Sequence, residues 1–242
     1  MKKYSRKLGI LGGMGPEATA SLYLNIISRC QRELHAKYNS DFPPIIINSF
    51  PVPDGRMWNG FNETEVKRAL VGSVKLLEGA GVDFIAIPCN SAHHFLPIMR
   101  KAVHIPILSI VDETAEKIKK RKIEKVLLLA TKFTVNRQIY DKSLADREIT
   151  LIKPRSMQQH LINEITIRVE SGRRNKADRT KIINIVDELK EKTGIQGVIG
   201  GCTEIPLLIQ SKDISLPLLD TIDIVAESCY ELICGKSDLE KS

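Results

Sequence analysis

The chain has 242 residues, of which 43% are hydrophobic and 27% charged, and its formal net charge is +7. This composition is typical of a globular protein of one large or two small domains and excludes a disordered chain. No run approaches the roughly 18 apolar residues of a membrane span. The basic start of the chain breaks into glycines too early for a signal peptide, so we expect a cytoplasmic protein that binds no membrane. Because the basic residues are mixed with acidic ones and not with aromatics, we expect no binding of nucleic acid.

The first elements along the chain are a strand, a glycine turn and a helix. The mostly apolar segment KLGIL at residues 7–11 predicts a short strand, and the GGMG segment at residues 12–15 predicts a turn. Pro16 suits the first position of a helix, because its fixed φ angle is helical and its missing N–H would have no partner there. The helix is expected to extend to about Leu34.

A second strand, a polar loop and a second helix follow. The mostly apolar segment PIIIN at residues 44–48 predicts the strand, and residues 51–62 predict the loop. Asn62 suits the N-cap of the helix, with Glu65 three residues later as in a capping box, and two glycines end the helix near residue 80. The alternation continues to the C-terminus. This order favours an α/β fold of mainly parallel sheets, in which sites lie at the carboxyl ends of strands.

Two segments of the first half recur in the second half. DFIAIPCNSAHHFLP (residues 83–97) and QGVIGGCTEIPLLI (residues 196–209) are each an apolar strand that ends at a cysteine, with a hydroxyl residue within two positions. IPILSIVDETAEKI (residues 105–118) matches LPLLDTIDIVAESC (residues 216–229) at proline, leucine, aspartate, alanine and glutamate positions. A weaker match links KLGILGGMG with KVLLLATKF. The repeat predicts a duplicated architecture.

We therefore expect an α/β fold of two pseudo-symmetric lobes, each a mainly parallel sheet flanked by helices. Lobe 1 should comprise residues 1–107, with a C-terminal helix in residues 220–242 that packs back on it, and lobe 2 residues 108–219. The active site should lie in the cleft between the lobes. Duplicated lobes that pack face to face would place Cys89 and Cys202 on opposite sides of that cleft.

Two thiols across a cleft suit three kinds of chemistry. They can form a redox couple, act as one nucleophile with a helper, or transfer protons as two bases. The last needs two groups that titrate near the working pH. A thiol at a helix N-terminus is acidified, and the residues that follow the two cysteines predict helix starts at Ser91 and Thr203.

Three motifs in order, GILGGMGP, PCNSAHHF and GGCTE, resemble the aspartate/glutamate racemase family over nearly the full length. The resemblance implies a cofactor-independent racemase of an acidic amino acid, aspartate or glutamate, that forms a homodimer of two-lobed chains. It implies that Cys89 and Cys202 are the opposed acid/base pair and that no metal is bound. It also implies that the substrate is bound by the glycine turn, by the polar residues after each cysteine and by a threonine at the start of lobe 2: Met14, Gly15, Asn90, Ser91, Thr203, Glu204 and Thr131.

Two positions depart from the family pattern. Relatives carry Pro-Asp-Arg in the first-lobe loop, whereas this chain has PDGR at residues 53–56. Arg56 is expected to bind the distal substrate carboxylate with its bidentate fork, the alternative being a solvated loop arginine. Relatives also carry a substrate-site lysine where this chain has Gln159 and His160. His160 is the candidate ligand there, the alternative being a position on the helix surface.

Four alternatives remain open. The chain could be another two-cysteine racemase or isomerase, of the hydantoin or maleate type; glutamate racemases usually have Thr-His after the second cysteine, unlike Thr203-Glu204. It could be a non-catalytic binder of the same fold. It could bind a dinucleotide at the G-x-G-x-x-A segment of residues 13–18, but the second strand lacks the acidic residue for ribose. A metal site at Cys89, His93 and His94 would lack a second thiol or carboxylate.

Overall fold

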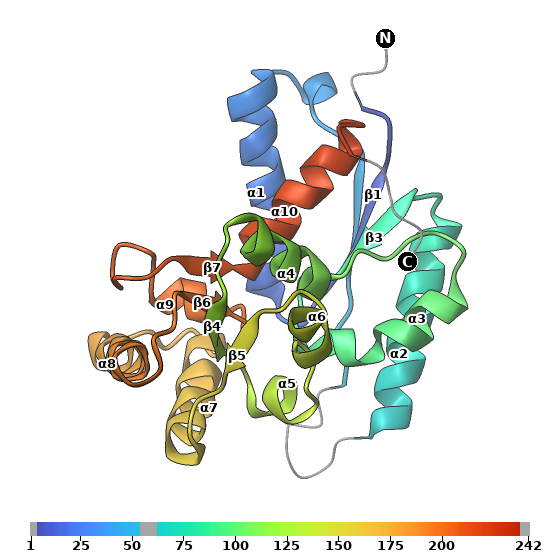
Figure 1. The fold of residues 1–242 in the computed structure, drawn as a ribbon. Helices are drawn as coiled ribbons and strands as arrows, with labels where there is room; N and C mark the ends of the chain where they lie inside the picture. The colour runs from blue at the N-terminus through green and yellow to red at the C-terminus, as the bar shows by residue number, and fades with distance from the viewer. Residues whose placement is uncertain (1–3, 54–61, 238–242) are drawn as a thin grey trace. The chain divides into compact units, whose positions relative to one another are not determined.

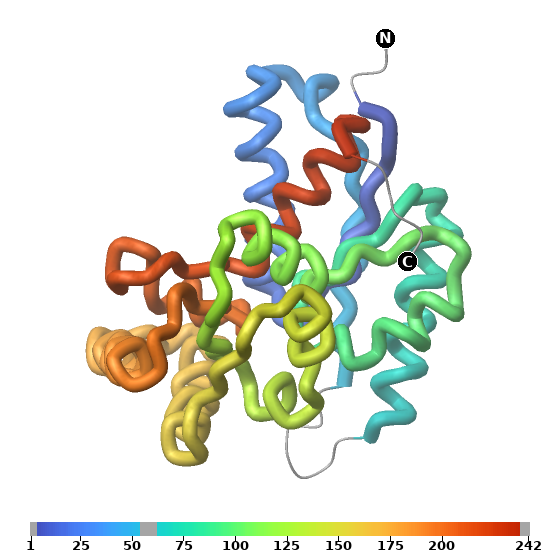
Figure 2. The backbone as a smooth tube through the Cα atoms, in the orientation of Figure 1, coloured from blue at the N-terminus to red at the C-terminus, as the bar shows by residue number. Residues whose placement is uncertain are grey.

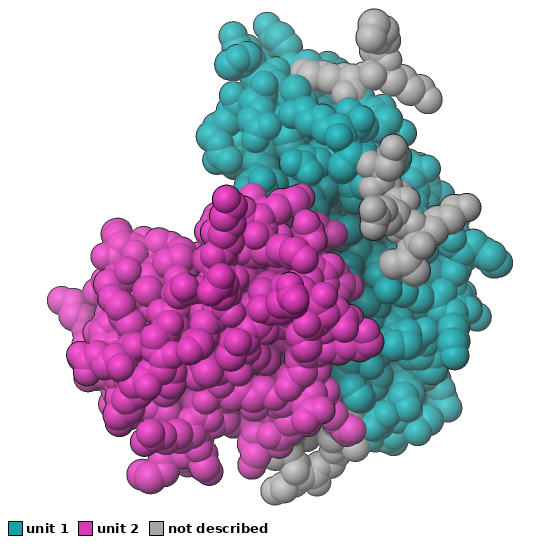
Figure 3. All heavy atoms as spheres, viewed as in Figure 1, with its two compact units in different colours: residues 1–110, 225–242 teal, residues 111–224 magenta. Residues whose placement is uncertain are grey.

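A computed structural model describes residues 4–53 and 62–237. The chain forms two compact units, one of residues 1–110 and 225–242 and the other of residues 111–224 (Figure 3). The expected lobe bounds at residues 107 and 219 lie a few residues before the unit bounds at residues 110 and 224. The division into two domains at these positions stays a prediction.

The first unit is built on a parallel sheet with strand order β2-β1-β3. Each strand lies directly beside its neighbour, as the backbone trace of β1 and β2 shows (Figure 2). An isolated parallel bridge between Ile85 of β3 and Ile107 adds one more position to the sheet beyond β3. The elements of this unit are β1 (Leu8–Gly12), α1 (Pro16–Leu34), η1 (Asn39–Asp41), β2 (Ile45–Ser49), α2 (Glu63–Gly79), β3 (Phe84–Ala86), η3 (Ser91–Phe95) and α3 (Leu96–Ala102), where η marks a 3₁₀ helix.

The second unit contains a four-stranded parallel sheet with order β5-β4-β6-β7. Apolar residues of α7 and α8 pack with β4 and β6 into one buried cluster, and Figure 1 shows both helices beside these strands. The remaining elements along the chain are α4 (Ile110–Lys120), β4 (Lys125–Leu129), α5 (Lys132–Asn136), α6 (Asp141–Ala145), β5 (Thr150–Ile152), α7 (Ser156–Glu170), α8 (Lys176–Thr193), β6 (Gly197–Gly200), α9 (Ile205–Leu208), β7 (Leu218–Asp220) and α10 (Thr221–Ile233). From residue 225 onward, α10 belongs to the first unit.

The two sheets have the same plan. β1 and β4 are central, β2 and β5 lie on one side, and β3 and β6 lie on the other. The bridge at Ile107 occupies in the first sheet the place that β7 occupies in the second. Each pair of repeated sequence segments therefore falls on equivalent elements, and the prediction of two related lobes with parallel sheets is confirmed.

Local sequence signals set the ends of several helices. Pro16 is the first residue of α1, as expected. The side chain of Asn62 caps α2, because its Oδ1 accepts hydrogen bonds from the backbone N–H groups of Thr64 at 3.1 Å and Glu65 at 3.3 Å. The strands begin one residue later than predicted at β1 and β2, a difference typical of element boundaries.

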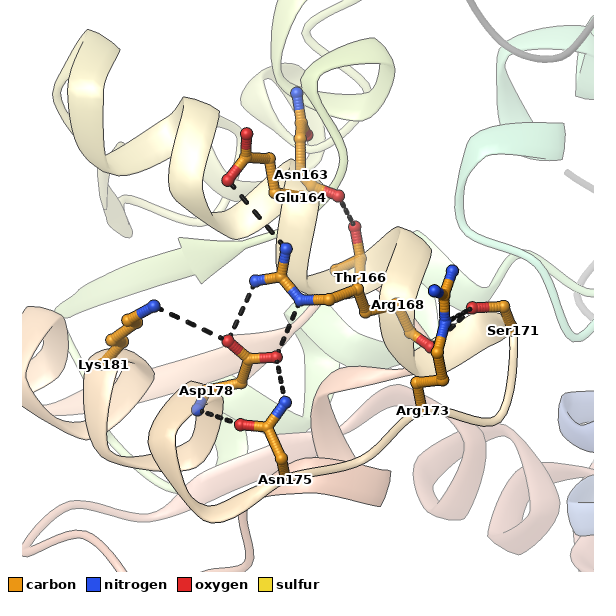
Figure 4. Close-up of polar contacts among 9 residues, drawn as sticks. All are labelled: Asn163, Glu164, Thr166, Arg168, Ser171, Arg173, Asn175, Asp178 and Lys181. Carbon is orange, nitrogen blue, oxygen red and sulfur yellow. Dashed lines mark hydrogen bonds and ion pairs between the residues drawn. The ribbon is translucent and has the colours of Figure 1, made fainter.

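An ion pair joins α7 to the start of α8 (Figure 4). The guanidinium of Arg168 donates to both carboxylate oxygens of Asp178, at 2.8 and 2.9 Å, and the Asn175 side chain donates to one of them at 2.8 Å. The Asp178 side chain is only 4% exposed. These bonds, above all that from Arg168, hold the pKa of the Asp178 carboxyl below its usual value.

Candidate active site

Cys89 follows the carboxyl end of β3 in the first unit. β3 and the two residues after it are buried, whereas Cys89 is half-buried, so the chain reaches the surface at the thiol. Asn90 is buried beside it, and Ser91 is the first residue of η3. The predicted polar residues thus lie at the strand end together with the cysteine.

His93 connects this strand end to the start of α4. Its Nδ1 lies 2.8 Å from the carbonyl oxygen of Cys89, and its Nε2 lies 3.0 Å from the backbone nitrogen of Ile110. Because the N–H of Ile110 can only donate, Nε2 accepts, and the proton of the imidazole is therefore on Nδ1. Both ring nitrogens are bonded to the backbone and neither is available to a metal.

The glycine turn after β1 lies at the same edge of the sheet, because β1 is parallel to β3. Gly13 has φ +92°, and a Cβ there would lie 2.2 Å from the carbonyl oxygen of Phe50, so only glycine fits. The hydroxyl of Thr19 accepts from the Gly13 N–H at 2.9 Å. The turn therefore holds Met14 and Gly15, both half-buried, at a defined place beside the end of the strand.

Cys202 has the equivalent place in the second unit, two residues after β6. A Cβ on Gly201 would lie 2.5 Å from the Leu128 side chain, so glycine lets the strand end lie close against β4. The Cys202 thiol, which is 8% exposed, lies 2.7 Å from Oε2 of Glu204 and donates a hydrogen bond to it. The Thr203 hydroxyl donates to the same carboxylate at 3.1 and 3.2 Å. Glu204 is thus a proton acceptor in direct contact with the thiol.

The end of β4 adds a further polar group next to the end of β6. Thr131 is buried there and caps α5, because its hydroxyl oxygen accepts from the backbone N–H of Thr134 at 3.2 Å. The Gln159 amide reaches this strand end from α7 and donates to the carbonyl of Ala130 at 2.8 Å. The neighbouring His160 points the other way: its side chain is 78% exposed, 3.3 Å from Glu164.

The structure groups the expected residues by unit. Met14, Gly15, Asn90 and Ser91 lie with Cys89, and Thr131, Thr203 and Glu204 lie with Cys202. Arg56 lies outside the described residues. The pairing of the two cysteines and the substrate roles of all these residues stay predictions.

The helical segments that follow the two cysteines differ from the expected α-helices in type or in starting residue. Ser91 begins a 3₁₀ helix of five residues, and α9 has four residues and begins at Ile205 rather than at Thr203. η3 leads directly into α3, so a helical stretch of residues 91–102 follows Cys89, whereas only the four-residue α9 follows Cys202. A helix dipole therefore contributes little at Cys202. At Cys202 the group that acts on the thiol is the Glu204 carboxylate.

Sequence reasoning missed three features of the site. The contact of Glu204 with the thiol, the bridge made by His93 and the inward position of Gln159 were not expected. The sequence indicates Glu204 only as a substrate ligand, although its spacing of two residues from the cysteine allows the contact. His93 was considered only as a metal ligand, and in the described part of the chain no cluster of three or more metal-ligating side chains occurs.

Comparisons with known proteins agree with this architecture. The family model described as Asp/Glu/Hydantoin racemase matches residues 11–229. The broad specificity amino-acid racemase RacX of Bacillus subtilis is 28% identical over 221 residues, which cover 91% of this chain and 95% of that protein. An aspartate racemase homologue from Pyrococcus horikoshii is 33% identical, with 95% and 99% of the two chains covered and a TM-score of 0.81. The aspartate racemase of Picrophilus torridus is 26% identical, with 98% of this chain and 97% of that chain covered and a TM-score of 0.80.

Proposed function

This chain belongs to the Asp/Glu/Hydantoin racemase family, and we propose that it interconverts the L and D forms of an acidic amino acid. The observation that carries the proposal is the matched placement of Cys89 and Cys202, each just beyond the carboxyl end of an equivalent strand in its unit. Such strand ends are where open α/β sheets place their sites.

In the proposed reaction the two cysteines act on opposite faces of the substrate Cα. The thiolate of one cysteine removes the α-proton, and the electron pair left on Cα delocalises into the substrate carboxylate. The thiol of the other cysteine then gives its proton to the opposite face and becomes a thiolate. The configuration is inverted, and the two cysteines have exchanged protonation states.

Polar groups beside each cysteine would bind the substrate. Asn90 and Ser91 in the first unit offer hydrogen-bond donors for the α-carboxylate, and Met14 and Gly15 of the glycine turn offer backbone N–H groups. Thr203 in the second unit offers a hydroxyl oxygen as an acceptor, because its proton is donated to Glu204. Glu204 would hold the proton of Cys202 in place through the 2.7 Å contact between carboxylate and thiol. These roles are supported by the positions of the residues at the two strand ends.

An acidic substrate suits the charge of the chain and the names of two relatives. The net charge is +7, which attracts anions at long range. One relative is an aspartate racemase and another an aspartate racemase homologue. A wider substrate range is the second candidate, because the Bacillus relative is described as having broad specificity.

We propose that the reaction needs neither pyridoxal phosphate nor a metal, since two thiols supply both proton transfers. Purified enzyme should keep its activity in EDTA, and added pyridoxal phosphate should not raise it. Activity that depends on either addition would contradict the mechanism.

A cytoplasmic location fits two observations. None of the five cysteines, all of which lie in the described ranges, forms a disulfide. Among residues 4–53 and 62–237, no helix has the length and apolar character that crossing a bilayer requires. Fractionation of cells that express the full chain would test the location, and recovery in the membrane pellet would contradict it.

The outer edge of the first sheet supports the proposal of a homodimer. β2 is the edge strand, and within the described residues nothing pairs with its outer side. Its three consecutive isoleucines are only partly buried, although such a run is typical of a strand covered on both faces. Ile47 of β2 is 41% exposed, and Phe50 and Leu76, which are 39% and 58% exposed, line a groove between the end of β2 and α2. An exposed apolar edge of this kind indicates an interaction surface.

A second copy of the chain is the partner that fits this surface. Glu65 and Arg68 line the groove between β2 and α2, so the surface carries both charges and can complement itself about a twofold axis. Leu76→Glu should therefore shift the protein from dimer to monomer in light scattering at micromolar concentration. Met157→Glu, at an 87% exposed position on α7, is the matched control. A wild-type monomer would contradict the proposal.

The experiment that tests the function is proton NMR of purified protein in D₂O. L-Asp, D-Asp, L-Glu and D-Glu are supplied singly, alongside neutral and basic amino acids. Loss of the α-proton signal together with formation of the other enantiomer, measured by chiral chromatography, identifies the substrates. Turnover restricted to Asp or Glu supports the acidic substrate class, and turnover across the whole panel supports broad specificity. No exchange with any amino acid would overturn the racemase proposal.

A further inference from the structure

The bridge made by His93 has a consequence for the first catalytic cysteine. The imidazole is 6% exposed and bonded at both nitrogens to the backbone, at 2.8 Å to the Cys89 carbonyl and at 3.0 Å to the Ile110 N–H. One bond belongs to the residue that carries the thiol and the other to the first residue of α4, 21 positions further along the chain than Cys89.

We propose that His93, as a neutral imidazole with its proton on Nδ1, is a positioning residue that sets the orientation of Cys89 for proton transfer. The Nδ1–H donates to the Cys89 carbonyl and thereby holds the turn after β3. The acceptor Nε2 is held in turn by the N–H of Ile110, which is fully buried. The inference rests on the two-thiol mechanism proposed above.

The geometry explains why this position needs an imidazole. The side chain must donate at one end and accept at the other across the width of a single ring, and a neutral imidazole does both. Asparagine can reproduce the donor near the ring position of Nδ1, and leucine can fill the volume but offers neither group. Because a thiol displaced by about 1 Å can lose 10²-fold in rate, loss of the bridge should be visible in catalysis.

The tautomer is tested first and without reference to activity. In a ¹⁵N-histidine spectrum of the wild-type protein, assigned with His93→Asn, we expect the His93 signals of a protonated Nδ1 and an unprotonated Nε2. A cationic ring, or a neutral ring with its proton on Nε2, would overturn the proposal.

The second test follows solvent-deuterium uptake by each pure enantiomer. His93→Leu should lower exchange about ten- to a hundredfold for the enantiomer whose exchange is lost in Cys89→Ser, and less than threefold for the other. His93→Asn should recover part of the loss, because it restores the donor to the Cys89 carbonyl. His94→Leu, a neighbouring half-buried histidine, is the matched control and should leave both enantiomers within threefold of wild type.

The outcomes separate this inference from the proposed function. An equal fall for both enantiomers in His93→Leu would mean that the histidine only supports the fold, and no fall would mean that it does not position Cys89. Either result overturns the positioning role while the two-thiol mechanism stands. If instead neither single Cys→Ser variant shows a preference for one enantiomer, the two-thiol mechanism itself fails, and the positioning role fails with it. Thermal melting shows whether His93→Leu folds. If it does not fold, the His93→Asn variant and the ¹⁵N-histidine spectrum of the wild type still test the positioning role.

Discussion

Cys89 and Cys202 occupy equivalent places in two related units, yet different groups contact them. At Cys89 the contact is made through the backbone, because the carbonyl accepts from His93. At Cys202 it is made through the sulfur, because the thiol donates to Glu204. The half-buried Cys89 is also more exposed than Cys202, of which 8% is accessible.

The difference shows which parts of the repeat are shared. The strands, their order and the cysteines recur, whereas the residues after the cysteines share little beyond a hydroxyl residue within two positions: NSAHHF follows one and TEIPLL the other. The fold supplies two equivalent positions for a cysteine, and a different side chain contacts the cysteine in each unit: His93 at Cys89 and Glu204 at Cys202. In the proposed mechanism both thiols must work in both directions, so we expect the two halves of the reaction to respond to different mutations.

The largest effect is expected from removing either thiol. Cys89→Ser and Cys202→Ser should each lower racemisation by about 10²- to 10⁴-fold, because serine is a far weaker acid/base group. Each variant should still exchange the α-proton of one enantiomer without inverting it, and the two should prefer opposite enantiomers. Deuterium uptake with chiral chromatography measures both quantities. Near wild-type racemisation by Cys202→Ser would show that Cys202 is only a buried cysteine at a strand end.

Removing the carboxylate beside Cys202 should affect one half-reaction only. Glu204→Gln should lower exchange about ten- to a hundredfold for the enantiomer lost in Cys202→Ser, since a hydrogen bond to a charged group is replaced by a neutral one. Exchange of the other enantiomer should change less than threefold. Glu191→Gln, which removes one negative charge from an exposed position on α8, is the control. A uniform loss for both enantiomers would indicate a role in substrate binding instead.

Arg56 tests whether the first unit also binds the distal carboxylate of the substrate. Arg56→Ala should lower kcat/KM for the acidic substrate by about 10- to 150-fold, the range expected for one bidentate charged contact. Both enantiomers should be affected alike, in contrast to the changes next to the thiols. Kinetics in both directions give the result, and an effect below threefold would mean that the glycine before it moves Arg56 out of the site.

The smallest effect on catalysis is expected from the ion pair between α7 and α8, which should change the stability of the second unit. Arg168→Met leaves the buried Asp178 carboxylate without its main partner and should destabilise the protein by about 3 kcal/mol at pH 7. Lys181→Met is the control, because its ammonium lies 3.9 Å from the same carboxylate but is 49% exposed, and such pairs contribute at most about 1 kcal/mol. Urea unfolding measures the loss of stability in both variants. The ratio of the α-proton exchange rates of the two enantiomers should not change in either variant.

The same pair predicts a dependence on pH. The pKa of Asp178 is lowered in the folded protein, mainly by the hydrogen bonds from Arg168. The stabilisation that the ionised Asp178 gives to the folded protein is therefore complete above the unfolded carboxyl pKa of about 4. It is lost as the pH falls through the lower pKa of the folded protein. The difference in stability between wild type and Arg168→Met should narrow below about pH 4. A difference that stays constant to pH 3 would show that Asp178 does not titrate in this range.

Much of the fold was predictable because its signals are local or repeated. Pro16 and Asn62 begin their helices as expected, since each acts on backbone groups within its own first turn. The repeat predicted two related parallel sheets, because strands that share a hydrophobic pattern take equivalent places. The helix starts after the cysteines were less predictable, because 3₁₀ turns are frequent at the ends of α-helices, as where η3 leads into α3.

By itself, the sequence determined the two-lobed α/β plan, the family and the position of both cysteines at strand ends. Tertiary structure alone decided which polar groups act on those cysteines. His93 accepts from a backbone N–H 17 residues away, and Gln159 donates to a carbonyl 29 residues away, while the adjacent His160 faces solvent. Such contacts depend on where the helices pack against the strand ends, which the pattern of neighbouring residues does not specify. The thiol contact of Glu204 is close in sequence, but it forms where β6 ends, at a glycine that lies close against Leu128 of β4.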